Sequence, residues 1–281
     1  MTPAAVLPEV HEVGAPPEVA AIYAGLREAI GVPIVNLVWR HFATLPGVLP
    51  WAWQTTRGAI RSATVAEGAA RMDALVRGAP GLGLPAVARV IRALPAEERA
   101  RVADTVRVYN RGNQVNLQVL SAVRRLVSGA AVGEAKPPPG GGEPLPPVGA
   151  SVPPLPRMEG LPDAARAELS AFAALHDPSN PVVPSLYRHL ALWPAILPAL
   201  REALAPHFAE GRIASLRDSL LGVGEESAAA LLPRLTPPGP FPAEHRDAVL
   251  RVLAVFPGKL IAEMAAIGLM LDAALARDGA P

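Results

Sequence analysis

Two stretches of the chain repeat one another, PIVNLVWRHFATLPGVLP at residues 33–50 and PVVPSLYRHLALWPAILP at residues 181–198. The second follows the first at a constant offset of 148 residues, and eight of the 18 aligned positions are identical without a gap. Most of the other positions exchange one residue for another of the same kind. Because chance does not produce such a match, we interpret the chain as two copies of one structural unit.

The segment between the two copies is rich in proline and glycine. Residues 133–157 hold nine prolines and five glycines, out of 33 prolines and 24 glycines in the 281-residue chain. No apolar periodicity survives there, which predicts an extended linker. The predicted organisation is therefore a first helical repeat at 1–132, the linker at 133–157 and a second helical repeat at 158–281. The two repeats are expected to form an intrachain pseudo-dimer.

The apolar residues within each copy recur at the spacing of a helix. Val87, Val90, Ile91 and Leu94 follow the pattern i, i+3, i+4, i+7, which places them on one helical face. Prolines stand where helices begin, as at residues 17 and 162. Alanine, leucine and arginine are good helix formers and dominate the composition, and alternating strand patterns with hairpin turns are absent. The sequence predicts an all-α fold with five or six helices in each half.

The composition excludes several classes of protein. The chain has no cysteine, which removes disulfides, thiolate metal sites and thiol nucleophiles. Its 26 basic and 25 acidic residues give a net charge of +1, so we expect neither a nucleic acid nor a membrane surface as partner. The apolar run at 260–271 is only 12 residues long and is too short to cross a bilayer. We expect a soluble, cytoplasmic protein and leave open whether it forms a homo-oligomer.

The histidines show no spacing typical of a metal site, and the sequence predicts neither a metal nor a cofactor. His41 and His189 occupy equivalent positions in the two copies, each directly after an arginine. The two arginine–histidine pairs could bind an anion near the pseudo-twofold axis. Alternatively, they lie on a polar helix face or hold the structure together through backbone carbonyls. We favour the second interpretation, because a repeat retains packing residues as well as functional ones.

Aromatic residues gather in and around the repeated stretches. They could line a pocket, but aromatic side chains at helical spacing usually belong to the core, which we favour here. These residues are Trp39, Trp51, Trp53, Tyr187 and Trp193.

Three asparagines lie within seven residues of a long helical pattern. They are Asn110, Asn113 and Asn116, and Gly112 stands among them. Asparagine and glycine are poor helix formers, so the group indicates either a kink with capping side chains or a polar pocket. Both interpretations stay open at this point.

These motifs together resemble the group I, non-stereospecific 2-haloacid dehalogenases, also called the halocarboxylic acid dehydrogenase family. Residues 32–53 look like the first-repeat signature of that family, and residues 185–197 look like its second-repeat signature. Residues 109–113, Tyr-Asn-Arg-Gly-Asn, contain its Asn-x-Gly-Asn motif. The motifs occur in the family's order and the resemblance covers nearly the whole chain.

The resemblance implies an all-α pseudo-dimer with an active site between the repeats. The family hydrolyses both enantiomers of short 2-haloacids to 2-hydroxyacids with inversion, by direct attack of water and without a covalent ester. An aspartate activates the water and an asparagine helps to position it. Asn113 matches the asparagine, and Ser185 is retained as a hydrogen-bonding group, but Leu186 occupies the position of the aspartate.

The expected substrate-binding residues also differ from the family. Ile34, Leu37 and Asn116 stand where the family has larger rings, and they complete the predicted binding site together with Leu186 and Tyr187. The expected ligand is a small carboxylic acid.

The replacement of the aspartate bears directly on the mechanism. A general base typically contributes a factor of about 10²–10⁴, and leucine cannot act as one. No acidic residue occurs at 29–66 or at 178–201, so a substitute has to come from outside the repeated stretches, and Asp177 and Glu263 are the candidates.

Two hypotheses on function follow from this pattern. The first is a 2-haloacid dehalogenase-like hydrolase with altered or reduced activity. The second is a non-catalytic protein that binds a small carboxylic acid or another apolar ligand. A helical protein–protein interaction module also fits the composition but explains none of the motifs.

Overall fold

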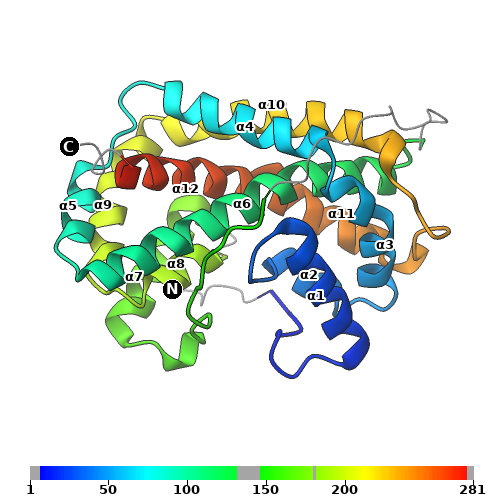
Figure 1. The fold of residues 1–281 in the computed structure, drawn as a ribbon, viewed down its shortest axis with the longest axis horizontal. Coiled ribbons are helices and arrows are strands. Elements are labelled where there is room, and N and C mark those ends of the chain that lie inside the picture. Colours follow the sequence, from blue (N-terminus) through cyan, green and yellow to red (C-terminus); the bar gives the residue numbers. More distant parts are fainter. Residues whose placement is uncertain (1–6, 132–145, 180–181, 277–281) are drawn as a thin grey trace.

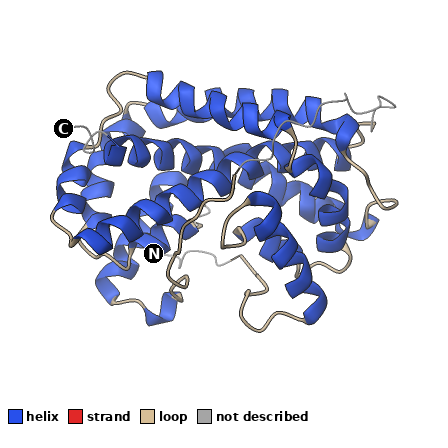
Figure 2. Ribbon diagram, viewed as in Figure 1, coloured by secondary structure: helices blue, strands red, loops and turns tan. Residues whose placement is uncertain are grey.

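The computed structural model describes residues 7–131, 146–179 and 182–276. Within these residues the fold is all-α and contains no strand (Figure 2), as the sequence predicts. Its elements are α1 (Pro17–Ile30), α2 (Leu37–Phe42), α3 (Val48–Ile60), α4 (Ala63–Gly78), α5 (Pro85–Arg92), α6 (Ala96–Val127), η1 (Met158–Gly160), α7 (Asp163–His176), α8 (Ser185–Leu190), α9 (Ile196–Ala209), α10 (Arg212–Leu231), η2 (Leu232–Arg234), η3 (Ala243–His245), α11 (Arg246–Val255), η4 (Phe256–Leu260) and α12 (Ile261–Ala276).

The repeated stretches form the same elements. Helix α2 begins at Leu37 and α8 at Ser185, and α3 begins at Val48 and α9 at Ile196, so both pairs are separated by the offset of 148 residues found in the sequence. The long helix α6 corresponds in the same way to the helical run 244–275. Similar sequence therefore gives similar local structure in both copies.

Helices from both copies build one hydrophobic core. Figure 1 shows α6 and α12 side by side along the middle of the molecule, with α4 and α10 paired along one edge. Leu117 and Leu120 of α6 and Ala266 and Ile267 of α12 are fully buried in this core. The inner faces of the two long helices therefore determine where the remaining elements pack.

The helical run 243–276 is long and apolar enough, by length and composition, to cross a membrane. In the structure 72% of its most apolar window is buried inside the protein. Burial on nearly every side explains this composition, because a helix at the centre of a core has no polar face.

Prolines and glycines mark the helix boundaries. Pro17 occupies the first turn of α1, and Gly31 ends that helix in a left-handed conformation with φ of 75°, which suits glycine. Pro162 differs slightly from the prediction, since it caps α7 and the helix begins at Asp163. Of the predicted linker, residues 146–157 contain no helix and residues 133–145 lie outside the described part of the chain.

Candidate functional site

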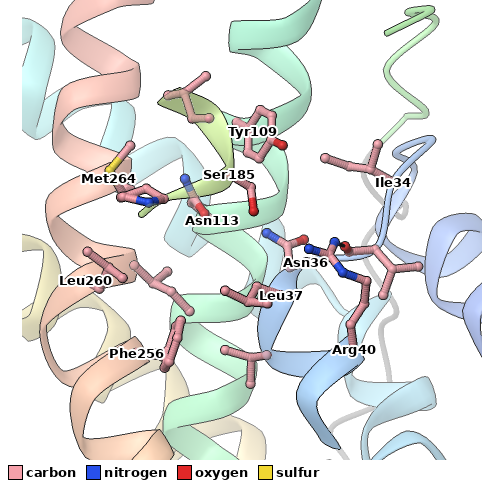
Figure 3. A pocket seen from close by; sticks show the side chains of 15 residues that line it. Ile34, Asn36, Leu37, Arg40, Tyr109, Asn113, Ser185, Phe256, Leu260 and Met264 are labelled. Atoms are coloured by element: carbon pink, nitrogen blue, oxygen red, sulfur yellow. Dashed lines mark hydrogen bonds between the residues drawn. The ribbon is translucent and has the colours of Figure 1, made fainter. Parts of the chain in front are cut away.

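A cavity lies where α2, α6, α8, η4 and α12 meet (Figure 3). Its volume is about 50 Å³, counted as the space open to the centre of a water molecule. The lining residues are Ile34, Val35, Asn36, Leu37, Val38, Arg40, Tyr109, Asn113, Pro184, Ser185, Leu186, Phe256, Leu260, Ile261 and Met264. We call this space the central cavity.

Equivalent positions of the two copies contribute to the central cavity. Leu37 and Val38 begin α2, and Ser185 and Leu186 begin α8 at the same two positions of the repeat. The cavity thus lies between corresponding elements, with α6 and α12 forming the rest of its wall.

Three polar atoms at the central cavity are buried without a hydrogen-bond partner among the described residues. They are Asn36 Oδ1, Arg40 Nη2 and Ser185 Oγ. Buried polar atoms are nearly always paired in proteins, because an unpaired one costs about 1–3 kcal/mol. The cavity therefore offers donors and an acceptor that a polar ligand can satisfy.

Glycine at position 112 allows Asn36 to approach α6 closely. A Cβ added there would lie 2.8 Å from Asn36 Oδ1, which is too close. Asn113 is the next residue of α6 and lines the cavity beside Asn36. The glycine of the Asn-x-Gly-Asn motif thus leaves room for the Asn36 side chain against α6, in the cavity that Asn113 also lines (Figure 3).

The guanidinium of Arg40 is held rigidly at the edge of the cavity. Its Nε atom donates to the carboxylate of Glu9 and its Nη1 atom donates to the backbone carbonyl of Val35. Both Arg40 and Glu9 have side chains only 5% exposed. Because two of its three nitrogens are occupied, Arg40 has Nη2 left to donate to a ligand.

Tyr109 is locked into a neutral pair with His189. The Nε2 atom of His189 lies 2.8 Å from the carbonyl oxygen of Pro153, and its Nδ1 atom lies 2.7 Å from the Tyr109 hydroxyl. A carbonyl only accepts, so Nε2 carries the proton and the tyrosine donates to Nδ1. Burial raises the pKa of Tyr109 and lowers the pKa of His189. Tyr109 can therefore only accept a hydrogen bond from a ligand.

A wide helical turn forms the apolar wall opposite these polar groups. Residues Phe256–Leu260 form a π-helical turn, η4, that contains Pro257. Proline has no N–H to donate to the preceding helical turn, and π-turns often occur at functional sites. Phe256 and Leu260 face the cavity together with Met264 of α12 (Figure 3).

The structure brings five of the residues singled out in the sequence together at this cavity. They are Ile34, Leu37, Asn113, Ser185 and Leu186.

Two further predicted binding residues lie elsewhere in the core. The side chain of Asn116 accepts a hydrogen bond of 2.7 Å from Trp39 Nε1. The Tyr187 hydroxyl lies 3.0 Å from His176 Nε2. Neither Asn116 nor Tyr187 lines the central cavity.

The two carboxylates considered as substitute bases do not line the cavity either. Glu263 is buried and bonds His176 Nδ1 at 2.7 Å and Arg217 Nη1 at 3.2 Å. Asp177 is 37% exposed and lies 3.9 Å from the ammonium of Lys259. Among the described residues that line the cavity, none carries a carboxylate or an imidazole. The cavity can bind and orient a polar ligand, but its own side chains include no general base.

The asparagine cluster fits neither sequence interpretation completely. Helix α6 runs unbroken from Ala96 to Val127, so none of the three asparagines caps a helix end. Only Asn113 reaches the cavity, while Asn110 donates 3.0 Å to the carbonyl of Gly268 on α12. The aromatic residues Trp39, Trp51, Tyr187 and Trp193 are buried in the core, as we favoured, and Trp53 is partly buried against it.

Both arginine–histidine pairs contact backbone carbonyls, as the structural interpretation predicts, while Arg40 Nη2 and Arg188 Nε keep no hydrogen-bond partner among the described residues. Arg188 Nη2 donates 2.8 Å to the carbonyl of Pro156, and His41 Nδ1 lies 2.8 Å from the carbonyl of Pro8. These contacts hold the extended segments that precede each copy.

Sequence reasoning missed Asn36, Tyr109 and the wall formed by η4, and it considered Arg40 as part of an anion-binding pair but favoured a structural role for it. The sequence offered two signals, Gly112 within a helix and the Pro-Gly pair at 257–258 within an apolar run.

Comparison with known proteins places the fold. No protein-family model and no curated protein sequence matches the chain. Solved structures that match include a D-2-haloacid dehalogenase mutant in complex with D-2-CPA, with TM-score 0.80, 18% identity and 96% of each chain covered. A D-2-haloacid dehalogenase mutant matches with TM-score 0.82, 17% identity and 96% of each chain. The enzyme in complex with L-LA matches with TM-score 0.81 and 17% identity, over 96% of this chain and 97% of that one.

The structural likeness extends over nearly the whole chain, although few residues are identical. The resemblance found in the sequence is therefore confirmed at the level of the fold, which this chain shares with D-2-haloacid dehalogenase.

Proposed function

We propose that the protein binds a small monocarboxylic acid in the central cavity and does not hydrolyse it. The observation that carries the proposal is the composition of the cavity wall. Its described residues combine Arg40, Asn36, Asn113 and Ser185 with no carboxylate or imidazole that could act as a base. Structures with the same fold hold D-2-CPA (D-2-chloropropionate) and L-LA (L-lactate), which are acids of this class.

We further infer that the chain is an intrachain pseudo-dimer with the central cavity at its pseudo-twofold axis. The equal offsets of α2 and α8 and of α3 and α9 support this inference. The contribution of the same two repeat positions, 37–38 and 185–186, to the cavity supports it as well.

Charge at the cavity favours an anionic ligand. Arg40 and Arg188, both nearly buried, lie on either side of a single carboxylate, Glu9. Two cations and one anion leave this buried group with one uncompensated positive charge, which is costly in a protein interior. A monocarboxylate bound at Arg40 Nη2 would neutralise it and satisfy the unpaired nitrogen.

The size of the cavity limits the ligand. A buried water needs roughly 10–15 Å³ of volume measured in this way, so 50 Å³ accommodates about three to five water molecules. An acid of about two to three carbons occupies a similar space. Phe256, Leu260 and Met264 would contact its apolar substituent.

Binding is tested by calorimetric titration with L-lactate and with each enantiomer of 2-chloropropionate. We expect saturable binding, and a rise in unfolding free energy of about 2.7 kcal/mol at a ligand concentration 100 times Kd. Asn113→Ala removes one cavity amide and should weaken binding roughly tenfold or more, since a hydrogen bond to a charged group is worth about 1.5–3 kcal/mol. The matched control, Arg61→Gln, changes an exposed residue and should bind like the wild type.

Hydrolysis is tested by halide release from the two 2-chloropropionates. The wild-type protein should release halide no faster than Asn113→Ala, whereas Leu186→Asp places a carboxylate in the cavity and should raise the rate. Release by the wild type above that of Asn113→Ala would overturn the proposal in favour of a dehalogenase with an unidentified base. Absence of binding by any of the three acids would refute the binding function itself.

A further inference from the structure

A second hollow lies next to the central cavity. It has a volume of about 300 Å³ and shares Ile34, Arg40 and Tyr109 with the central cavity. Its other lining residues are His11, Glu12, Val13, Pro33, Val152, Pro153, Pro154, Leu155, Arg157, Arg188 and His189. We call it the arginine groove.

The arginine groove has an excess of positive charge. Three arginines line it, Arg40, Arg157 and Arg188, against one carboxylate, Glu12. Glu12 is already engaged, because its oxygens accept hydrogen bonds from Arg27 Nη1 at 2.6 Å and from the backbone N–H of Val35 at 2.9 Å. The groove therefore has more cations than its own carboxylate can neutralise.

Arg188 is the most deeply placed of the groove's own cations. It is only 9% exposed, and its Nη2 atom donates to the carbonyl of Pro156. Its Nη1 atom lies 3.8 Å from Glu9, which is beyond hydrogen-bonding distance. Its Nε atom is buried and has no hydrogen-bond partner among the described residues. A buried guanidinium with an unused N–H donor lines a space large enough for a small molecule.

Two described carboxylates, Glu9 and Glu159, act electrostatically on Arg188, but neither forms a hydrogen bond with its Nε atom. The carboxylate of Glu9 accepts a hydrogen bond from Arg40 Nε. His189 is neutral, and its Nε2–H donates to the carbonyl oxygen of Pro153. His11 lies 3.8 Å from the other oxygen of Glu9.

We propose that the arginine groove is a second carboxylate-binding site, in which a small monocarboxylate accepts a hydrogen bond from Arg188 Nε before it reaches the central cavity. The shared wall of Ile34, Arg40 and Tyr109 places the two sites back to back. The acid would then pass from Arg188 in the groove to Arg40 in the central cavity. These two arginines occupy equivalent positions of the repeat. The identity of the acid rests on the proposed function, whereas the existence of the groove site does not.

The direct test follows the arginine Nε–H resonances of the wild-type protein by ¹⁵N–¹H NMR during titration with L-lactate. We expect the Arg188 Nε–H resonance to shift with a saturable curve of its own. An unchanged Arg188 resonance at saturating lactate would overturn the proposal. Saturation by chloride with the same affinity would also overturn it, by showing a site for any small anion.

Variants separate the two sites. Arg188→Lys keeps the charge but removes the Nε donor, and it should weaken the groove site at least tenfold while the central site still binds. Asn113→Ala should do the reverse, with a normal Arg188 shift and weakened binding at the central site. If Asn113→Ala abolishes the Arg188 shift, a single site accounts for both signals and the groove site is refuted. If lactate shifts Arg188 but never occupies the central cavity, the proposed function fails and the groove site stands.

Discussion

The carboxylate of Glu9 is the group on which the two repeated arginines depend. The Glu9 side chain is 5% exposed, and one of its oxygens contacts Arg40 Nε. Its other oxygen lies 3.8 Å from Nη1 of Arg188, whose side chain is 10% exposed. Replacing Glu9 with alanine would leave two guanidinium groups buried near each other with no anion between them. We therefore expect Glu9→Ala to be among the most destabilising substitutions in the chain.

The size of the effect follows from the burial of the group. Removal of one partner from a buried ion pair costs about 3–5 kcal/mol, because the remaining charge is left uncompensated. This is a large part of the 5–15 kcal/mol that typically separates folded from unfolded states. The matched control is Glu28→Ala, since Glu28 bonds Arg61 but is 75% exposed. A pair of that kind contributes only about 0–1 kcal/mol.

Urea unfolding followed by tryptophan fluorescence measures both variants. A small carboxylate added in solution should occupy the space of the missing side chain and restore part of the stability of Glu9→Ala. At ten times its Kd, acetate should add about 1.4 kcal/mol. Chloride at the same ionic strength should add less, because it cannot bridge two guanidinium groups with two oxygens.

Two results would refute this reasoning. A free energy of unfolding for Glu9→Ala within 1 kcal/mol of the wild-type value would show that the arginines do not need the carboxylate. Equal stabilisation by acetate and chloride would show that the vacated position has no preference for a carboxylate.

Further predictions concern packing and pH. Gly268→Ala should lower the free energy of unfolding by about 1–3 kcal/mol, because its Cβ would overlap Asn110 Oδ1 in the core. Gly222→Ala, in the exposed middle of α10 with no atom within 4 Å of the new Cβ, should raise it by about 0.5–1 kcal/mol. The urea midpoints of the two variants measure these changes. A higher midpoint for Gly268→Ala than for Gly222→Ala would contradict the packing described around Gly268. Burial lowers the pKa of His189 below its usual range, and Arg188 and Arg40 lower it further. The unfolded state then binds more protons below about pH 6.5, so stability should fall as the pH drops from 7 towards 5, and an NMR pKa of His189 above 6.5 would disprove this.

The sequence predicted the secondary structure well because helices depend on near neighbours. The proline at 17 indicated a helix start, and α1 begins there. The apolar spacing of Val87, Val90 and Ile91 indicated a helical face, and these residues lie in α5. Periodicity of 3.6 residues, a proline at a helix start and a glycine at its end all act within a few positions. The repeated stretch likewise predicted that α2 and α8 would be equivalent.

The roles of individual polar side chains could not be predicted in the same way. Asn113 lines a cavity, whereas Asn110 and Asn116 bond partners 158 and 77 residues away. The three asparagines are evenly spaced along α6. The positions of α12 and α2 therefore decide which amide bonds a neighbouring helix and which one lines the cavity. The same holds for Glu263, whose partner His176 is 87 residues distant.

The sequence by itself determined the all-α class, the repeated unit and the absence of an aspartate at position 186, since each of these depends on residue identity and local spacing. The tertiary structure alone decided that Arg40 Nη2 has no partner among the described residues, that the described wall of its cavity holds no carboxylate or imidazole, and that Glu9 lies between Arg40 and Arg188. Hydrogen-bond satisfaction and burial depend on every neighbour in space, and those neighbours come from segments that the chain separates widely.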